Sequence, residues 1–318
     1  MMYIGIDLGG TNIAAGVVDK TGKILHKDSV KAGADRHYSE IIKDMAELAK
    51  KVTLDAGFSL KDVEWVGIGS PGTCDGERGI LVYANNLNFY NVPMREEFQK
   101  HFNVPVYIAN DADCAAYGEA MVGNAKGTKS SVTITLGTGV GGGIIIDNKI
   151  ISGFNSAGGE LGHMVIMMDG EDCTCGKKGC WEAYASATAL IRQTQQAMKE
   201  HPESLMWKEA GSLENASGRT SFNAAKKGDP VGQMVVDRYL QYVAVGVLNI
   251  IAIFQPEKLL IGGGISNEGD YILNPIREYV KKYDYCRTEQ HTEITTAALA
   301  NDAGIIGGAF LGAQYAGK

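Results

Sequence analysis

The chain has 318 residues, and its 30 lysines and arginines against 37 aspartates and glutamates leave a formal net charge of −7. The length predicts about two domains, and an acidic chain without a long basic run is not expected to bind nucleic acid. No apolar run approaches the roughly 18 residues that span a bilayer, and the N-terminus lacks the pattern of a signal peptide. We therefore expect a cytoplasmic protein outside the membrane, in which the six cysteines are free or bound to metal.

In chain order, the first part of the sequence predicts a meander of strands and then alternating helices and strands. The expected strands lie at 3–8, 13–18, 24–30, 64–69 and 104–109, and the expected helices at 39–56, 93–102 and 114–121. We expect Asp113 to cap the last of these helices and residues 73–76 to form a turn.

The beginning of the chain is repeated 128 positions later. Residues 6–11 (IDLGGT) align without a gap with residues 134–139 (ITLGTG), and 17–19 (VVD) align with 145–147 (IID). Two glycine-rich hairpins can resemble each other by chance, but here the apolar register, the turn and the terminal aspartate all coincide. The repeat therefore predicts a duplicated domain.

The second half predicts mainly helices, at about 186–200, 231–254, 271–283 and 305–315, with a strand at 258–261. Four glycines give the last helix small residues at helical spacing: Gly304, Gly307, Gly308 and Gly312. We expect this helix to pack closely, back on the first domain.

Glycine accounts for 41 residues, or about 13%, against a usual share of about 7%, and it clusters at predicted strand ends. Residues 67–72 and 137–142 match the G-x-G-x-x-G pattern of dinucleotide sites, which requires a following helix. A turn or a strand follows here instead, so the pattern argues against a Rossmann dehydrogenase. A P-loop is also disfavoured, because no Gly-Lys pair is present near Gly123.

A glycine turn between antiparallel strands can hold phosphate with its backbone N–H groups and a threonine hydroxyl. The turns at 9–11 and 137–139 both qualify, although either one alone is more often a simple tight hairpin. Two such turns in a duplicated domain could hold one triphosphate across a cleft, and Asp7 could hold Mg²⁺ through water.

Three cysteines lie within eight residues, and a histidine lies ten residues upstream: His163, Cys173, Cys175 and Cys180. This set suits a structural Zn²⁺, whereas a chance cluster or a redox role is disfavoured. The other three cysteines are isolated, and we expect them in the core or at neutral positions.

Three carboxylates lie next to the predicted strand ends or the cysteine loop. Asp111 directly follows a buried strand, where it could accept a hydroxyl proton as the base of a kinase does, or serve only at a helix N-terminus. Glu160 and Glu182 flank the cysteine loop, so a bound metal would hold both at one site suited to vicinal hydroxyls.

Together these segments resemble the ROK family of bacterial sugar kinases and repressors, within the actin-like ATPase superfamily. The matching segments run in family order over essentially the whole chain: DLGGT at 7–11, SPG at 70–72, NDA at 110–112, LGTGVGGG at 136–143, ELGH at 160–163, CTCGKKGCWE at 173–182, IGGG at 261–264 and NDAG at 301–304. The motifs with histidine and cysteine are highly specific, whereas the first turn is shared across the superfamily. The pattern is most similar to the ATP-dependent glucokinases of Gram-positive bacteria.

The resemblance implies an α/β fold of two duplicated actin-like (ribonuclease H-like) domains with an interdomain cleft. One domain would comprise 1–112 plus 300–318, and the other 113–299 with a zinc loop at 163–182. The implied reaction transfers the γ-phosphate of ATP to the 6-hydroxyl of glucose, with Mg²⁺ and a structural Zn²⁺ as cofactors. A homodimer or homotetramer is also implied.

The resemblance also implies roles for individual residues. Asp111 would be the base, and the sugar would be held by Gly72, Asn86, Asn110, Asp111, Glu160, His163 and Glu182. His163 would bind zinc with one ring nitrogen and face the sugar with the other. ATP would be held by Asp7, Gly9, Gly10, Thr11, Asn12, Thr138, Gly139, Gly263 and Gly264. Two positions depart from the family pattern, Asn12 and Asp113, and Asp113 could raise the pKa of Asp111.

Three alternatives remain open. A sugar-responsive repressor of the same family is disfavoured, because no DNA-binding segment precedes the first strand. An actin-like chaperone or filament ATPase would explain the glycine turns but not the cysteine cluster with its two glutamates. A kinase for N-acetylglucosamine, N-acetylmannosamine, allose or fructose, or one that uses polyphosphate, is not excluded, since one pocket contact changes preference by only about 1–3 kcal/mol.

Overall fold

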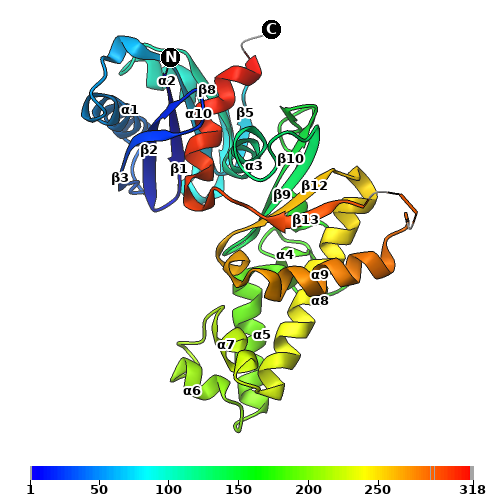
Figure 1. Ribbon diagram of the computed structural model, residues 1–318. Coiled ribbons are helices and arrows are strands. Elements are labelled where there is room, and N and C mark those ends of the chain that lie inside the picture. Colours follow the sequence, from blue (N-terminus) through cyan, green and yellow to red (C-terminus); the bar gives the residue numbers. More distant parts are fainter. Residues whose placement is uncertain (1, 287, 290, 316–318) are drawn as a thin grey trace. The chain divides into compact units, whose positions relative to one another are not determined.

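The computed structural model describes residues 2–286, 288–289 and 291–315 (Figure 1). The chain packs into two compact units. Unit 1 comprises Met1–Thr133, Gly142–Gly159 and Ala297–Lys318, and unit 2 comprises Ile134–Gly141 and Glu160–Thr296. The domain limits expected above, 1–112 plus 300–318 and 113–299, follow the sequence repeat rather than packing, and they stay a prediction.

The first sheet has five strands in the order β3-β2-β1-β4-β8. Its strands are β1 (Met2–Leu8), β2 (Asn12–Asp19), β3 (Ile24–Lys31), β4 (Val63–Ser70) and β8 (Val106–Asn110). The pairs β1–β2 and β2–β3 are antiparallel, whereas β1–β4 and β4–β8 are parallel. The predicted meander is therefore confirmed, and the parallel strands carry their C-terminal ends to one edge of the sheet.

The second sheet has the order β11-β10-β9-β12-β13, which repeats the order of the first. Its strands are β9 (Ser130–Leu136), β10 (Val140–Ile146), β11 (Lys149–Ile150), β12 (Lys258–Gly262) and β13 (Glu293–Thr296). Strands β9 and β10 begin 128 residues after β1 and β2, at positions 130 and 140 instead of 2 and 12. The duplication inferred from the sequence is confirmed.

A small antiparallel sheet follows β4, where the sequence predicts only a turn. It consists of β5 (Thr73–Asp75), β6 (Ile80–Ala84) and β7 (Phe89–Val92). The predicted turn at 73–76 is therefore wrong. A strand of three residues is too short to show alternation, so its pairing with β6 decides its conformation.

The remaining elements are helices that cover the sheets or extend unit 2. In unit 1 they are η1 (Leu60–Asp62), η2 (Asn85–Leu87), η5 (Ala300–Asp302), α1 (Tyr38–Asp55), α2 (Met94–Gln99), α3 (Asp111–Met121) and α10 (Ala303–Tyr315). In unit 2 they are η3 (Leu161–His163), η4 (Gly264–Glu268), α4 (Glu182–Ala185), α5 (Ala187–Glu200), α6 (Met206–Ala210), α7 (Thr220–Lys226), α8 (Pro230–Phe254) and α9 (Asp270–Tyr283).

Helix α8 is long and apolar enough to pass a length-and-composition test for a membrane span. This corrects the expectation that no segment approaches such a length. Half of the most apolar 18-residue stretch of this helix is buried in the structure. The core helices of soluble proteins also meet these criteria of length and composition. The helix packs on α4, α5, α7 and α9 of its own unit, which accounts for its apolar composition.

The last helix, α10, lies against the first sheet and α3 (Figure 1). Glycines allow this close approach. A Cβ atom on Gly5 would lie 1.7 Å from the backbone oxygen of Ile305, and one on Gly67 would lie 1.8 Å from the backbone oxygen of Gly308. Neither β1 nor β4 could carry a side chain at these positions without displacing α10. The close packing expected of this helix is confirmed.

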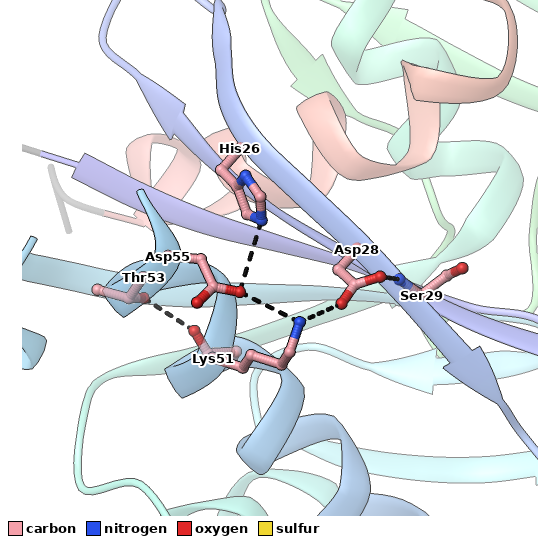
Figure 2. Close-up of polar contacts among 7 residues, drawn as sticks. His26, Asp28, Ser29, Lys51, Thr53 and Asp55 are labelled. Atoms are coloured by element: carbon pink, nitrogen blue, oxygen red, sulfur yellow. Dashed lines mark hydrogen bonds and ion pairs between the residues drawn. The ribbon is translucent and has the colours of Figure 1, made fainter. Parts of the chain in front are cut away.

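Strand β3 and helix α1 are joined on the surface by a group of ion pairs (Figure 2). Lys51 Nζ lies 2.5 Å from Asp28 Oδ2 and 3.1 Å from Asp55 Oδ2, and His26 Nε2 lies 3.8 Å from the same oxygen of Asp55. All of these side chains are well exposed, so solvent screens them and they contribute little to stability. We assign them no role in the functional site.

A buried carboxylate in α3 holds the segment that precedes α10. Glu119 Oε1 accepts hydrogen bonds from the N–H groups of Ala298 and Leu299, each at 2.7 Å, and its Oε2 accepts one from Asn124 N at 2.9 Å. The side chain is fully buried. A buried carboxylate needs hydrogen-bond donors, and these three backbone N–H groups provide them.

We expect Glu119→Gln to lower the free energy of unfolding by about 2 kcal/mol, because an amide cannot accept hydrogen bonds through its nitrogen and one backbone donor would lose its partner. Urea denaturation would measure the change. The exposed Glu47→Gln serves as the control, since Glu47 forms an ion pair with Lys50 on the surface of α1. Equal stability of the two variants would contradict the role given to Glu119.

Candidate active site

Asn110 ends strand β8 and caps helix α3. Its Oδ1 accepts hydrogen bonds from Ala112 N at 2.8 Å and Asp113 N at 3.3 Å, while its Nδ2 donates to the backbone oxygen of Gly72 at 3.0 Å. The prediction that Asp113 caps this helix is wrong, because the helix begins at Asp111 and Asp113 lies buried within its first turn. The extended backbone of Asn110 at the strand end provides the cap geometry instead.

Asp111 is the first residue of α3, at the C-terminal edge of the first sheet. Burial raises the pKa of its carboxyl group, and hydrogen bonds from the N–H groups of Ala112 and Asp111 and from the Asn110 side chain oppose this rise. Burial, rather than the charge of Asp113, is therefore the main cause of the raised pKa of Asp111. A carboxylate with a raised pKa is a better proton acceptor than an ordinary surface aspartate.

Asp7 lies near the end of β1 and forms a second carboxylate beside the first. Burial, and then the charge of Asp111, raise the pKa of Asp7 to about 6. A Cβ atom on Gly304 would lie 2.9 Å from Asp7 Oδ2, so α10 also closes this side of the carboxylate. Two carboxylates that repel each other fit the chemistry of Mg²⁺, which would relieve the repulsion when bound.

The raised pKa of Asp7 predicts that Asp7→Asn changes the free energy of unfolding by an amount that depends on pH. The pKa of Asp7 is higher in the folded protein, at about 6, than the usual value of 3.8. The wild-type carboxyl group therefore favours the folded state below pH 4, and this contribution is lost as the pH rises through 6. Without Mg²⁺, we expect the variant to be more stable than wild type at pH 7.5 by up to about 3 kcal/mol, and equally stable near pH 4.

Urea denaturation at both pH values would measure the effect of Asp7→Asn. The control is Asp172→Asn, which removes a carboxylate from an exposed position. A stability gain of the Asp7 variant that is the same at pH 4 and pH 7.5 would contradict the raised pKa of Asp7.

The first glycine turn, residues 9–12, connects β1 and β2. Gly9 N donates to Asn12 O at 2.9 Å, which closes the turn, and Thr11 and Asn12 are exposed. A Cβ atom on Gly10 would lie 3.7 Å from the Cβ of Asn86, so the turn neighbours the segment between β6 and β7. Unit 1 thus contains the first glycine turn, Asp7, Asp111 and the predicted sugar ligands Gly72, Asn86 and Asn110.

Gly72 allows another close backbone approach in unit 1. It has a φ of +93°, and a Cβ atom there would lie 2.0 Å from the backbone oxygen of Tyr83. Only glycine fits both requirements without strain. Gly72 therefore sets the position of the small sheet next to the Asn110 side chain.

The second glycine turn, residues 137–140, connects β9 and β10. Gly137 N donates to Gly139 O at 3.0 Å, and Val140 N donates to Glu182 Oε2 at 2.9 Å. Gly263 packs against the end of β9, because it has a φ of +85° and a Cβ atom there would lie 2.3 Å from Leu136 O. Unit 2 therefore brings Thr138, Gly139 and Glu182 together, with the Gly263–Gly264 cluster at the neighbouring strand end.

The four predicted metal ligands come together in unit 2, where their ligand atoms all lie within 4.8 Å of one another: His163, Cys173, Cys175 and Cys180. Cys175 Sγ and Cys180 Sγ are 3.6 Å apart, and Cys173 Sγ is 3.7 Å from His163 Nδ1. A tetrahedral zinc about 2.3 Å from its sulfur ligands separates two of them by about 3.8 Å. The donor set and spacing therefore fit Zn²⁺.

Glu160 and His163 lie at the two ends of the same short 3-10 segment. Glu160 is exposed, and its backbone oxygen accepts a hydrogen bond from His163 N at 3.0 Å. Nδ1 is the ring nitrogen of His163 that faces the cysteines, which leaves Nε2 for another ligand. Both side chains belong to unit 2, as expected from their motif.

Two duplicated α/β sheets with the same strand order, each with a glycine turn between its first two strands, define the actin-like (ribonuclease H-like) class of proteins. The model of the ROK family matches residues 3–314, so the chain belongs to this family.

The chain is 38% identical to the glucokinase of Thermotoga maritima, over 97% of this chain and 96% of that protein. It is 31% identical to the xylose repressor of Caldicellulosiruptor bescii, over 96% of this chain and 76% of the repressor. The structure of a ROK family glucokinase from Streptomyces griseus in complex with glucose and AMPPNP is 35% identical, with a TM-score of 0.82, and the match covers 98% of this chain and 99% of that one.

Proposed function

We propose that this protein is an ATP-dependent glucokinase, which transfers the γ-phosphate of ATP to the 6-hydroxyl of glucose and releases glucose 6-phosphate and ADP. The observation that carries the proposal is its full-length similarity to glucokinases, at 38% identity to the enzyme of Thermotoga maritima. The raised pKa of Asp111 at the edge of the first sheet supplies the base that this reaction needs.

Asp111 acts as the general base in the proposed reaction. Its carboxylate accepts the proton of the 6-hydroxyl while the hydroxyl oxygen forms a bond to the γ-phosphorus and the bond from phosphorus to the leaving ADP oxygen breaks. Asn110 fixes the start of α3 and thereby the position of this carboxylate. Protein groups contribute mainly alignment and charge stabilisation in such transfers.

The proposal assigns a set of residues to each substrate. Glucose is held by Gly72, Asn86, Asn110, Glu160, His163 and Glu182. The phosphates of ATP are held by Gly9–Asn12, Thr138 and Gly139, and its nucleoside lies near Gly263 and Gly264. Asp7 holds Mg²⁺ through water, and that ion would neutralise phosphate charge when bound.

The zinc cluster has a structural role in the proposed function, because four protein ligands leave no open position for chemistry. We expect elemental analysis to find about one zinc per chain. Cys173→Ser should lose the metal and unfold at a lower temperature, since zinc binding contributes directly to folding of its loop. Cys286→Ser, outside the cluster, should retain both zinc and stability, and a metal-free wild type with full activity would contradict the site.

A coupled ADP-release assay across a panel of sugars tests the proposed activity. We expect the highest kcat/KM with glucose among glucose, N-acetylglucosamine, N-acetylmannosamine, allose and fructose, and we expect ATP to be preferred over polyphosphate. A higher kcat/KM for another sugar would replace glucose as the substrate without removing the kinase activity. ATP turnover that no sugar increases would contradict a sugar kinase altogether.

A further inference from the structure

The second glycine turn is held by the start of α5. Ala187 N donates to Gly137 O at 2.8 Å, and the Thr188 hydroxyl donates to Thr138 O at 2.8 Å. Both contacts fix carbonyl groups of the turn, which point toward α5. The peptide planes of residues 137 and 138 are therefore oriented by one short segment of unit 2.

Glu182 holds the other end of the same turn. Its Oε2 accepts the N–H of Val140 at 2.9 Å, and a Cβ atom on Gly139 would lie 2.3 Å from this oxygen. With Val140 N paired in this way, the N–H groups of Thr138 and Gly139 are the donors that the turn can offer to a phosphate.

The segment that carries these contacts is itself fixed to the core of unit 2. Trp181 is fully buried, its Nε1 donates to Tyr242 O at 2.8 Å, and its ring lies against Gly246 of α8. Trp181 also separates Glu182 from Cys180, a member of the metal cluster. Glu182 therefore extends from a rigid support, as a positioning residue must.

We propose that Glu182 and Thr188 are positioning residues, which hold the second glycine turn in the conformation that binds the phosphates of ATP. The inference rests on the proposed function, in which this turn is a phosphate site. Glu182 uses Oε2 for the turn, so Oε1 is available for the sugar contact proposed above. One side chain thereby links the positions of both substrates.

Calorimetric titration with AMPPNP and Mg²⁺, without sugar, tests this proposal. We expect Thr188→Val and Glu182→Ala each to weaken AMPPNP binding by about tenfold, since each removes one hydrogen bond to the turn. Thr188→Ser keeps the hydroxyl and Glu182→Gln keeps an acceptor, so both should stay within about threefold of wild type. Because no sugar is present, a lost sugar contact cannot produce this pattern.

Steady-state kinetics separates positioning from a general loss of structure. Thr188→Val should raise KM for ATP and leave KM for glucose unchanged, with the zinc content and melting temperature of wild type. If Glu182→Ala does not fold, the pair of Thr188 variants decides the question alone. Equal AMPPNP affinities of Thr188→Val, Thr188→Ser and wild type overturn the inference, even if wild type phosphorylates glucose.

Failure of the proposed function has a different signature. A wild-type protein that binds AMPPNP but phosphorylates no sugar contradicts the glucokinase activity, while the ranking of the variants in AMPPNP affinity still tests the turn. A folded wild type that does not bind AMPPNP contradicts both the phosphate site and its positioning.

Discussion

Asp111→Asn is expected to lower kcat for glucose phosphorylation by about 10²–10⁴-fold, the usual contribution of a general base. The amide is similar in size and can still accept the hydrogen bond from Ala112 N, so the start of α3 should be retained. It cannot take the proton of the 6-hydroxyl. KM for ATP should change little, because the side chain is assigned to the sugar hydroxyl rather than to the nucleotide.

The matched control is Glu40→Gln, which removes a carboxylate from the first turn of another helix of unit 1. This variant should retain the kcat of wild type. Asp111→Asn with a kcat within a few-fold of wild type would remove Asp111 as the base. A loss of the same size in Glu40→Gln would show that the assay responds to charge in general.

The largest effect on stability is expected for Gly67→Ala in β4. The added Cβ would lie 1.8 Å from the backbone oxygen of Gly308, and a backbone atom cannot move aside as a flexible side chain can. Helix α10 must therefore shift away from the sheet, and we expect the free energy of unfolding to fall by about 4 kcal/mol or more.

Urea denaturation of Gly67→Ala measures this loss, with Gly264→Ala as the control. A Cβ atom on Gly264 would meet open space, so the control should remain close to wild type in stability. A Gly67 variant as stable as the control would mean that β4 and α10 tolerate a wider separation than their contact indicates.

Local sequence pattern predicted most of the regular elements, because amphipathic spacing and glycine turns act over a few residues. The 128-residue repeat predicted two similar sheets, and β1, β2, β9 and β10 have the expected register. The cysteine motif predicted a metal cluster, since loop ligands close in sequence need little tertiary information to meet. Cys74 and Cys114 are buried, as expected of isolated cysteines.

Features that depend on long-range packing escaped prediction. The three residues of β5 become a strand through pairing with β6, and α3 starts at Asp111 because a parallel strand delivers Asn110 in a capping conformation. The contact of Glu182 with Val140 N joins residues 42 positions apart. No local signal distinguishes such a glutamate from one on the surface. The contact becomes evident only from the fold, in which a Cβ atom on Gly139 would lie 2.3 Å from Glu182 Oε2.

The glycine contacts of α10 also bear on the order of events during synthesis. Gly5 and Gly67 leave the ribosome long before Ile305 and Gly308, which cover them. A nascent chain that lacks α10 therefore exposes bare backbone on β1 and β4, and Asp7 lacks its neighbour Gly304. Unit 1 can therefore reach its native packing only after α10 has been synthesised, so a nascent chain that ends before Ala303 should not yet be competent for catalysis.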